Sequence, residues 1–121
     1  MEKIFMNNAS SNLDIQAALE LLGGEEDLYK ELLLAYIAAL PKDINQLYDL
    51  EKDSSLNEAA KFVHRLKGSS LQIGATEFGK TAQELEDLLR NKQQGNIQEL
   101  TQRFIKQYEE LVQEVKAMVE K

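Results

Sequence analysis

The chain has 121 residues, which is the usual length of one domain and is enough to bury a core. Its formal net charge of −7 argues against nucleic acid and anionic membranes as partners, and no apolar run approaches the roughly 20 residues that a membrane helix needs. With no cysteine and one histidine, disulfides and cysteine metal sites are excluded, and a histidine metal site is disfavoured. We therefore expect a soluble, cytoplasmic protein.

The first part of the chain is expected to hold an arm and a short helix. Strong helix formers dominate the composition and only one proline occurs, so the expected fold is all-α. Residues 1–10 are expected to form a flexible N-terminal arm. A short helix follows, capped by Ser10, Ser11 or Asn12, and the glycine pair at 23–24 ends it.

Three longer helices are predicted next. The first spans residues 25–50, where Pro41 either kinks one helix or marks the point at which two helices meet. A kink is preferred, because the helical period continues beyond the proline. Ser55, followed three positions later by a glutamate, is a capping-box pattern that opens the second of them, and Gly74 ends it. The third is expected over residues 76–92, where the apolar residues are spaced for one buried face.

The last predicted helix begins after Asn96, which also has a glutamate three positions on, and its apolar residues are spaced almost as in a coiled coil. Short connections between consecutive long helices favour antiparallel neighbours. The sequence therefore predicts an up-down-up-down antiparallel four-helix bundle with a short extra N-terminal helix.

His64 is predicted to face outward from the middle of its helix. Each residue advances about 100° around a helix, which places the core residues Phe62 and Leu66 within roughly 40° of the side opposite His64. An ordinary surface histidine is one interpretation, and a nucleophile within a flat, accessible patch is the other. The residues expected on the same outward face are Ala60, Lys61, Lys67, Gly68 and Leu71.

The residues one turn beyond His64 favour the second interpretation. Histidine is an uncharged nucleophile near neutral pH. Lys67 supplies a cation where a phosphoryl group could lie. Gly68 removes a side chain that would obstruct another protein, although a glycine within a helix costs roughly 0.5–1 kcal/mol relative to alanine.

The segment from Ala60 to Ser70, followed by Ile73-Gly74-Ala75, resembles the signature of histidine-containing phosphotransfer (HPt) domains. Weaker similarities lie at Gly24-Glu25-Glu26 and at Leu85-Glu86 with Arg90, so that the resemblance covers about residues 13–118. It implies a single HPt domain over residues 11–121.

The resemblance implies a stoichiometric phosphocarrier of a two-component phosphorelay rather than an autonomous enzyme. His64 would accept a phosphoryl group on Nε2 from a receiver-domain aspartyl phosphate and pass it to an aspartate of another receiver. Lys67 would contact the phosphoryl group, and Gly68 would leave room for the receiver. The partners would be receiver domains of response regulators and hybrid kinases, which would carry the Mg²⁺. We expect no cofactor in this chain, and a monomer.

Glu86 and Arg90 allow two interpretations. Their i, i+4 spacing is that of a surface ion pair worth a few tenths of a kcal/mol. Alternatively, Glu86 accepts a hydrogen bond from the Nδ1–H of His64 and leaves Nε2 free, while Arg90 helps to bind the phosphoryl group or the receiver. The residues expected to dock the receiver are Ala60, Lys61, Arg65 and Leu71.

Two other function classes are alternatives to the phosphocarrier. A helical interaction module that binds a kinase or receiver without carrying phosphate would not need His64, Lys67 and Gly68 together. An autonomous kinase is disfavoured because the sequence shows no glycine-rich nucleotide loop. Met1 favours a stand-alone protein over an excised domain of a hybrid kinase, but the sequence leaves both open.

Overall fold

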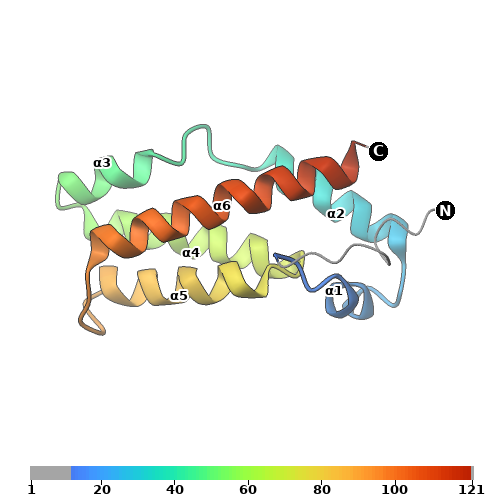
Figure 1. The fold of residues 1–121 in the computed structure, drawn as a ribbon, viewed down its shortest axis with the longest axis horizontal. Helices are drawn as coiled ribbons and strands as arrows, with labels where there is room; N and C mark the ends of the chain where they lie inside the picture. The colour runs from blue at the N-terminus through green and yellow to red at the C-terminus, as the bar shows by residue number, and fades with distance from the viewer. Residues whose placement is uncertain (1–11, 121) are drawn as a thin grey trace.

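The computed structural model describes residues 12–120, which form six helices and no strand, so the all-α prediction is confirmed (Figure 1). The predicted N-terminal arm, residues 1–10, lies outside the described residues. The helices are α1 (Ile15–Leu21), α2 (Glu26–Ala38), α3 (Gln46–Lys52), α4 (Leu56–Gln72), α5 (Thr76–Leu89) and α6 (Ile97–Val119).

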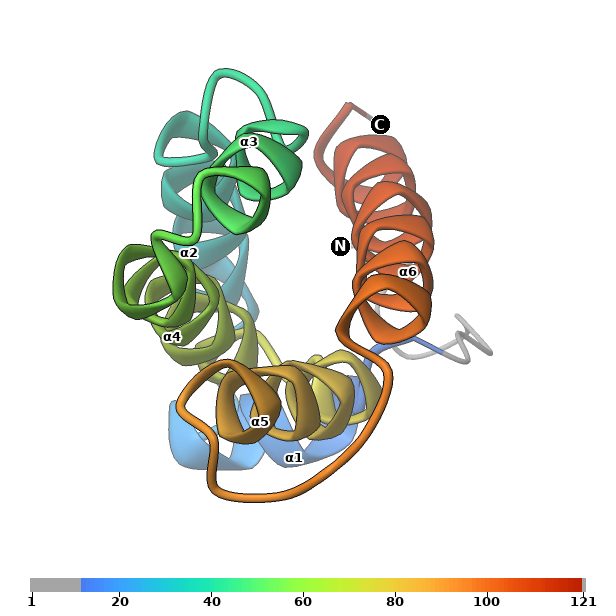
Figure 2. The ribbon, with the colours of Figure 1, turned by 90° about the vertical axis from the view of Figure 1, so that its left-hand side faces the viewer.

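The helices form an antiparallel bundle with four sides. Helices α2 and α3 follow one another along one side, and α4, α5 and α6 then run in alternating directions (Figure 1). In the end-on view of Figure 2 these sides surround a common centre, and contacts of α2 with α6, α3 with α4, α4 with α5 and α5 with α6 close the ring. The predicted up-down-up-down arrangement is confirmed, with α1 as the extra N-terminal helix packed against α2.

The core is built from the apolar stripe of each helix, together with two buried tyrosines. Phe78 of α5 stacks on Phe104 of α6, with 4.8 Å between the ring centroids. Buried Tyr29 and Tyr36 of α2 use their hydroxyls to hold the C-terminal half of α4. Tyr36 Oη lies 2.9 Å from Ser70 Oγ, so this buried serine has a hydrogen-bond partner. These contacts fix the helix that carries His64.

The preferred kinked helix over residues 25–50 is wrong, and the alternative of two separate helices on either side of Pro41 is confirmed. Helix α2 ends at Ala38 and α3 begins at Gln46. Pro41 has no N–H for an intrahelical hydrogen bond, and its ring disfavours helical geometry in the residue before it. A new turn then starts at Asp43, whose carboxylate accepts a hydrogen bond from the backbone N–H of Asn45.

The cap of the first helix also differs from the prediction. Asp14 is the N-cap, and its Oδ1 accepts a hydrogen bond of 3.1 Å from the backbone N–H of Ala17. Asn12 lies two residues before this position and is not the cap, while residues 10 and 11 lie outside the described part. The backbone N–H of Asp14 donates to the carbonyl of Gly74, which ties the start of α1 to the turn between α4 and α5.

The other predicted helix ends have mixed outcomes. Ser55 is the N-cap of α4 but makes no side-chain cap hydrogen bond, so the predicted capping box is wrong. Helix α5 ends at Leu89, before the predicted residue 92, because Asn91 takes a left-handed φ of 61° that no helix can continue. The cap at Asn96 is confirmed, since its side chain accepts a 2.9 Å hydrogen bond from the N–H of Glu99.

Gly74→Ala should lower the free energy of unfolding by about 2 kcal/mol or more. Gly74 has a φ of 93°, and an added Cβ would lie 2.6 Å from the backbone oxygen of Asp14. Gly24→Ala is the matched control, because Gly24 also has a positive φ but an added Cβ there meets no atom within 4 Å. Urea titrations measure the loss of unfolding free energy in each variant. Equal losses would show that the contact with the backbone of Asp14 adds nothing to the cost at Gly74.

Candidate functional site

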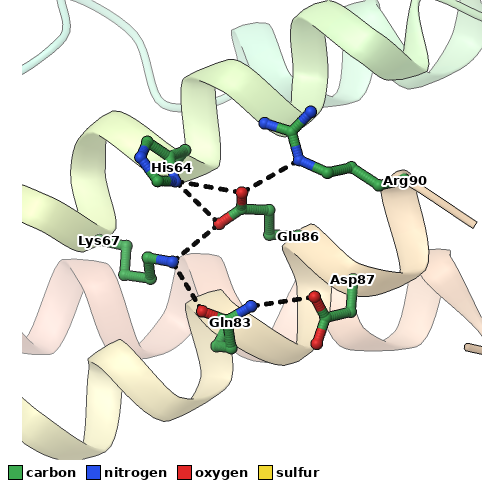
Figure 3. Close-up of polar contacts among 6 residues, drawn as sticks. All are labelled: His64, Lys67, Gln83, Glu86, Asp87 and Arg90. Atoms are coloured by element: carbon green, nitrogen blue, oxygen red, sulfur yellow. Dashed lines mark hydrogen bonds and ion pairs between the residues drawn. The ribbon is translucent and has the colours of Figure 1, made fainter. Parts of the chain in front are cut away.

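His64 lies on the outer surface of α4, as predicted. Its side chain is 59% exposed, whereas Phe62, Val63 and Leu66 of the same helix are buried. Helix α4 packs along its length against α5, and the inner edge of the imidazole ring faces that helix (Figure 3). The histidine is therefore fixed on one side by α5 and open to solvent on the other.

Glu86 of α5 is the centre of the site, and three side chains converge on its carboxylate (Figure 3). The Nδ1 atom of His64 lies 3.1 Å from Oε2 and 3.2 Å from Oε1. Lys67 donates to Oε1 at 3.0 Å, and the Nε–H of Arg90 donates to Oε2 at 3.0 Å. The Glu86 side chain is only 9% exposed, so this is a buried carboxylate with its charge matched by neighbours.

The convergent donors keep Glu86 ionised. Burial raises the pKa of the Glu86 carboxyl, but the hydrogen bonds from Lys67, His64 and Arg90 outweigh burial and lower it to about 2. An ionised carboxylate can only accept hydrogen bonds. In neutral His64, Nδ1 is therefore the protonated ring nitrogen, and Nε2 keeps its lone pair.

One contact from each interpretation of the Glu86–Arg90 spacing is present, and the role of Arg90 toward a phosphoryl group stays a prediction. The predicted i, i+4 ion pair is present, and so is the predicted contact of Glu86 with Nδ1 of His64. Within residues 12–120, Nε2 of His64 and the two terminal nitrogens of Arg90 have no hydrogen-bond partner. These nitrogens remain available to a ligand or partner.

Lys67 is held by a residue that sequence reasoning missed. Its ammonium donates to Oε1 of Gln83 at 2.6 Å as well as to Glu86, and its side chain is only 15% exposed. Gln83 in turn donates through Nε2 to Oδ1 of Asp87 at 2.9 Å. The helical spacing in the sequence indicates only that Gln83 and Asp87 can meet on one face of α5, and it does not pair Gln83 with Lys67 of α4.

Gly68 lies in open space. A Cβ built on Gly68 meets no atom within 4 Å, and the residue is exposed. At Gly79 of α5 an added Cβ would meet the side chain of Leu71, whereas at Gly68 it would meet nothing. Packing within the described part of the chain therefore gives no reason for the glycine at 68.

The remaining predicted surface residues divide into exposed and buried. Lys61 is exposed and pairs with Glu58 at 3.5 Å, and Leu71 is 44% exposed. Arg65 is exposed and lines an open groove of about 500 Å³ between α4 and the loop that joins α2 to α3. The expected exposure of Ala60 is wrong: the residue is fully buried, because α4 contacts α3 as well as α5 and its buried surface is wider than one stripe.

Residues 12–120 contain neither a cluster of metal-binding side chains nor a membrane-spanning helix. Over this range no group of three or more His, Asp or Glu residues is placed to hold a metal ion. None of the described helices is long and apolar enough to span a bilayer.

The geometry agrees with a comparison against protein families, in which residues 31–119 match the family described as "Hpt domain". The chain belongs to the Hpt family. The match begins within α2, so α1 precedes it, whereas the resemblance was expected from about residue 13. No match was found among curated proteins or among solved structures. An Hpt domain implies histidine phosphotransfer in a phosphorelay.

The stability of this Hpt domain should depend on pH through Glu86. Because the folded-state pKa of about 2 lies below the ordinary value of 4.5, ionised Glu86 stabilises the fold above pH 4.5, and this contribution is lost as the pH falls toward 2. Glu86→Gln should therefore cost about 1–2 kcal/mol near neutral pH, and its difference from the wild type should shrink between pH 4.5 and 2.

Chemical denaturation at several pH values measures that difference. Glu84→Gln is the control on the same helix, because it removes an exposed ion pair with Arg103, which contributes little. A Glu86→Gln difference that stays constant from pH 4.5 to 2 would show that the carboxylate is not held ionised by its neighbours.

Proposed function

We propose that His64 accepts a phosphoryl group on Nε2 from a receiver-domain aspartyl phosphate and passes it to an aspartate of a second receiver. The observation that carries the proposal is the hydrogen-bond geometry of the imidazole, whose Nδ1 faces the ionised Glu86 while Nε2 is open. In this proposal the protein is a stoichiometric carrier in the cytoplasm, which the Hpt family supports, and it acts as a monomer.

The transfer step needs no proton movement in this geometry. The Nε2 lone pair of His64 attacks phosphorus, and an N–P bond forms as the P–O bond to the receiver aspartate breaks. The aspartate carboxylate leaves with the electron pair. The imidazole keeps its Nδ1 proton and becomes positively charged, and Glu86 offsets that charge at about 3 Å. Onward transfer reverses the step with a second carboxylate.

The positive charges of Lys67 and Arg90 near His64 are complementary to the negative charge of the phosphoryl group. Lys67 lies one turn away on the same helix, and Arg90 presents two terminal nitrogens beyond Glu86 (Figure 3). Both therefore act on the phosphoryl oxygens in this proposal. The Mg²⁺ that the family implies belongs to the receiver.

The receiver docks on the face of α4 that carries His64. Gly68 supports this placement, because nothing in the described part of the chain fills the space above it. The docking surface that we propose comprises Lys61, Arg65, Gly68 and Leu71, and it excludes the buried Ala60. Arg65 has no ion pair within residues 12–120, so its charge is available to the acidic face of a receiver.

His64→Gln should abolish phosphoryl uptake and leave the fold intact, because glutamine supplies no nucleophilic nitrogen and His64 is largely exposed. The protein is incubated with phosphoramidate or with a phosphorylated receiver, and phosphohistidine is followed by ³¹P NMR, with circular dichroism for the fold. A folded His64→Gln variant that still gains an acid-labile phosphoryl group would rule out His64. A wild-type protein that binds receivers but takes up nothing from either donor would instead support an interaction module.

Gly68→Gln and Arg65→Glu should slow transfer from a receiver by tenfold or more, yet leave uptake from phosphoramidate near the wild-type rate, because the small donor does not dock. Gly68→Ala is the matched control: it fits the open space and should stabilise the helix by about 0.5–1 kcal/mol. Equal losses with both donors would indicate damage to the site rather than to docking.

A further inference from the structure

The ammonium group of Lys67 is held by two hydrogen bonds, and its side chain is largely shielded from solvent. Two acceptors on α5, Gln83 at 2.6 Å and Glu86 at 3.0 Å, hold its ammonium group, and lysine is seldom this well buried. An ammonium group has three N–H donors. With two of them bonded to α5, one is left for a phosphoryl oxygen.

The orientation of Gln83 is itself set by Asp87. The side-chain amide has an acceptor end and a donor end, and the Nε2 end donates to Oδ1 of Asp87 at 2.9 Å. The amide oxygen is thereby turned toward Lys67, as Figure 3 shows. Because Asp87 lies four residues after Gln83, the two side chains share one face of α5.

The charge of the acceptor at position 83 matters as much as its position. With a neutral imidazole, the formal charges of Lys67 and Arg90 balance those of Glu86 and Asp87, so the cluster sums to zero. A neutral amide at position 83 restrains the ammonium and adds no charge, whereas a carboxylate there would bring the sum to −1. A phosphoryl group, which carries negative charge, would then gain less on transfer.

We propose that Gln83 is a positioning residue for phosphotransfer: oriented by Asp87, it fixes the Lys67 ammonium without neutralising it. This inference rests on the proposed function, since it assigns a role in the reaction at His64. Gln83 is exposed, so it acts through Lys67 and not by supporting the core.

The experiment measures the rate of phosphohistidine formation from phosphoramidate, which reports on the site without docking. Gln83→Glu should slow uptake by about tenfold, because the added carboxylate offsets the Lys67 charge that the phosphoryl group needs, and Gln83→Ala, which adds no charge, should slow it less. In a Lys67→Ala background the same substitutions should have no further effect, because Gln83 acts through the lysine.

A second readout does not depend on turnover. In ¹H–¹⁵N spectra at low temperature, the Lys67 ammonium of the wild type should exchange slowly with water, and Gln83→Ala should speed this exchange although the fold is unchanged. Glu84→Gln, one residue along α5 and paired with Arg103, should match the wild type in both readouts.

Failure of the inference is distinct from failure of the proposed function. A wild-type rate for Gln83→Glu, equal losses with and without Lys67, or unchanged ammonium exchange in Gln83→Ala would each overturn the positioning role while His64 remains the carrier. Absence of phosphohistidine in the wild type would overturn both.

Discussion

The site depends on one buried carboxylate that stays ionised between two helices. Glu86 lies at the contact of α4 with α5, where burial alone would favour its neutral form. Hydrogen bonds from His64, Lys67 and Arg90 reverse that preference. Each donor is held because the carboxylate is charged, and the carboxylate is charged because the donors are there. Removing any one of these side chains therefore leaves the remaining ones less firmly held.

The fold provides that contact through a helical hairpin. Gly74 makes the turn from α4 to α5 with a positive φ, and the start of α1 bonds to its carbonyl oxygen. Tyr29 and Tyr36 hold the end of α4 from α2, on the neighbouring side of the bundle. A rigid α4 presents His64 with little orientation to lose on docking, which is what phosphoryl transfer asks of a protein.

The helical pattern predicted the bundle and the outward position of His64, because both follow from spacing within one helix. Features that depend on neighbouring elements escaped prediction. The burial of Ala60 needs α3 beside α4, which spacing within α4 does not reveal. At Pro41 the proline is compatible with either a kink or a break, and the helical period alone does not decide between them. The Gln83–Lys67 contact joins two helices, so spacing on either helix alone could not reveal it.

We propose that Glu86 sets the tautomer of His64 and leaves Nε2 as the nucleophile. A long-range ¹H–¹⁵N correlation spectrum of the wild-type protein, recorded where the imidazole is neutral, measures this tautomer directly. We expect a protonated Nδ1 and an unprotonated Nε2, with that preference weakened in Glu86→Ala. A spectrum in which Nε2 carries the proton would contradict it.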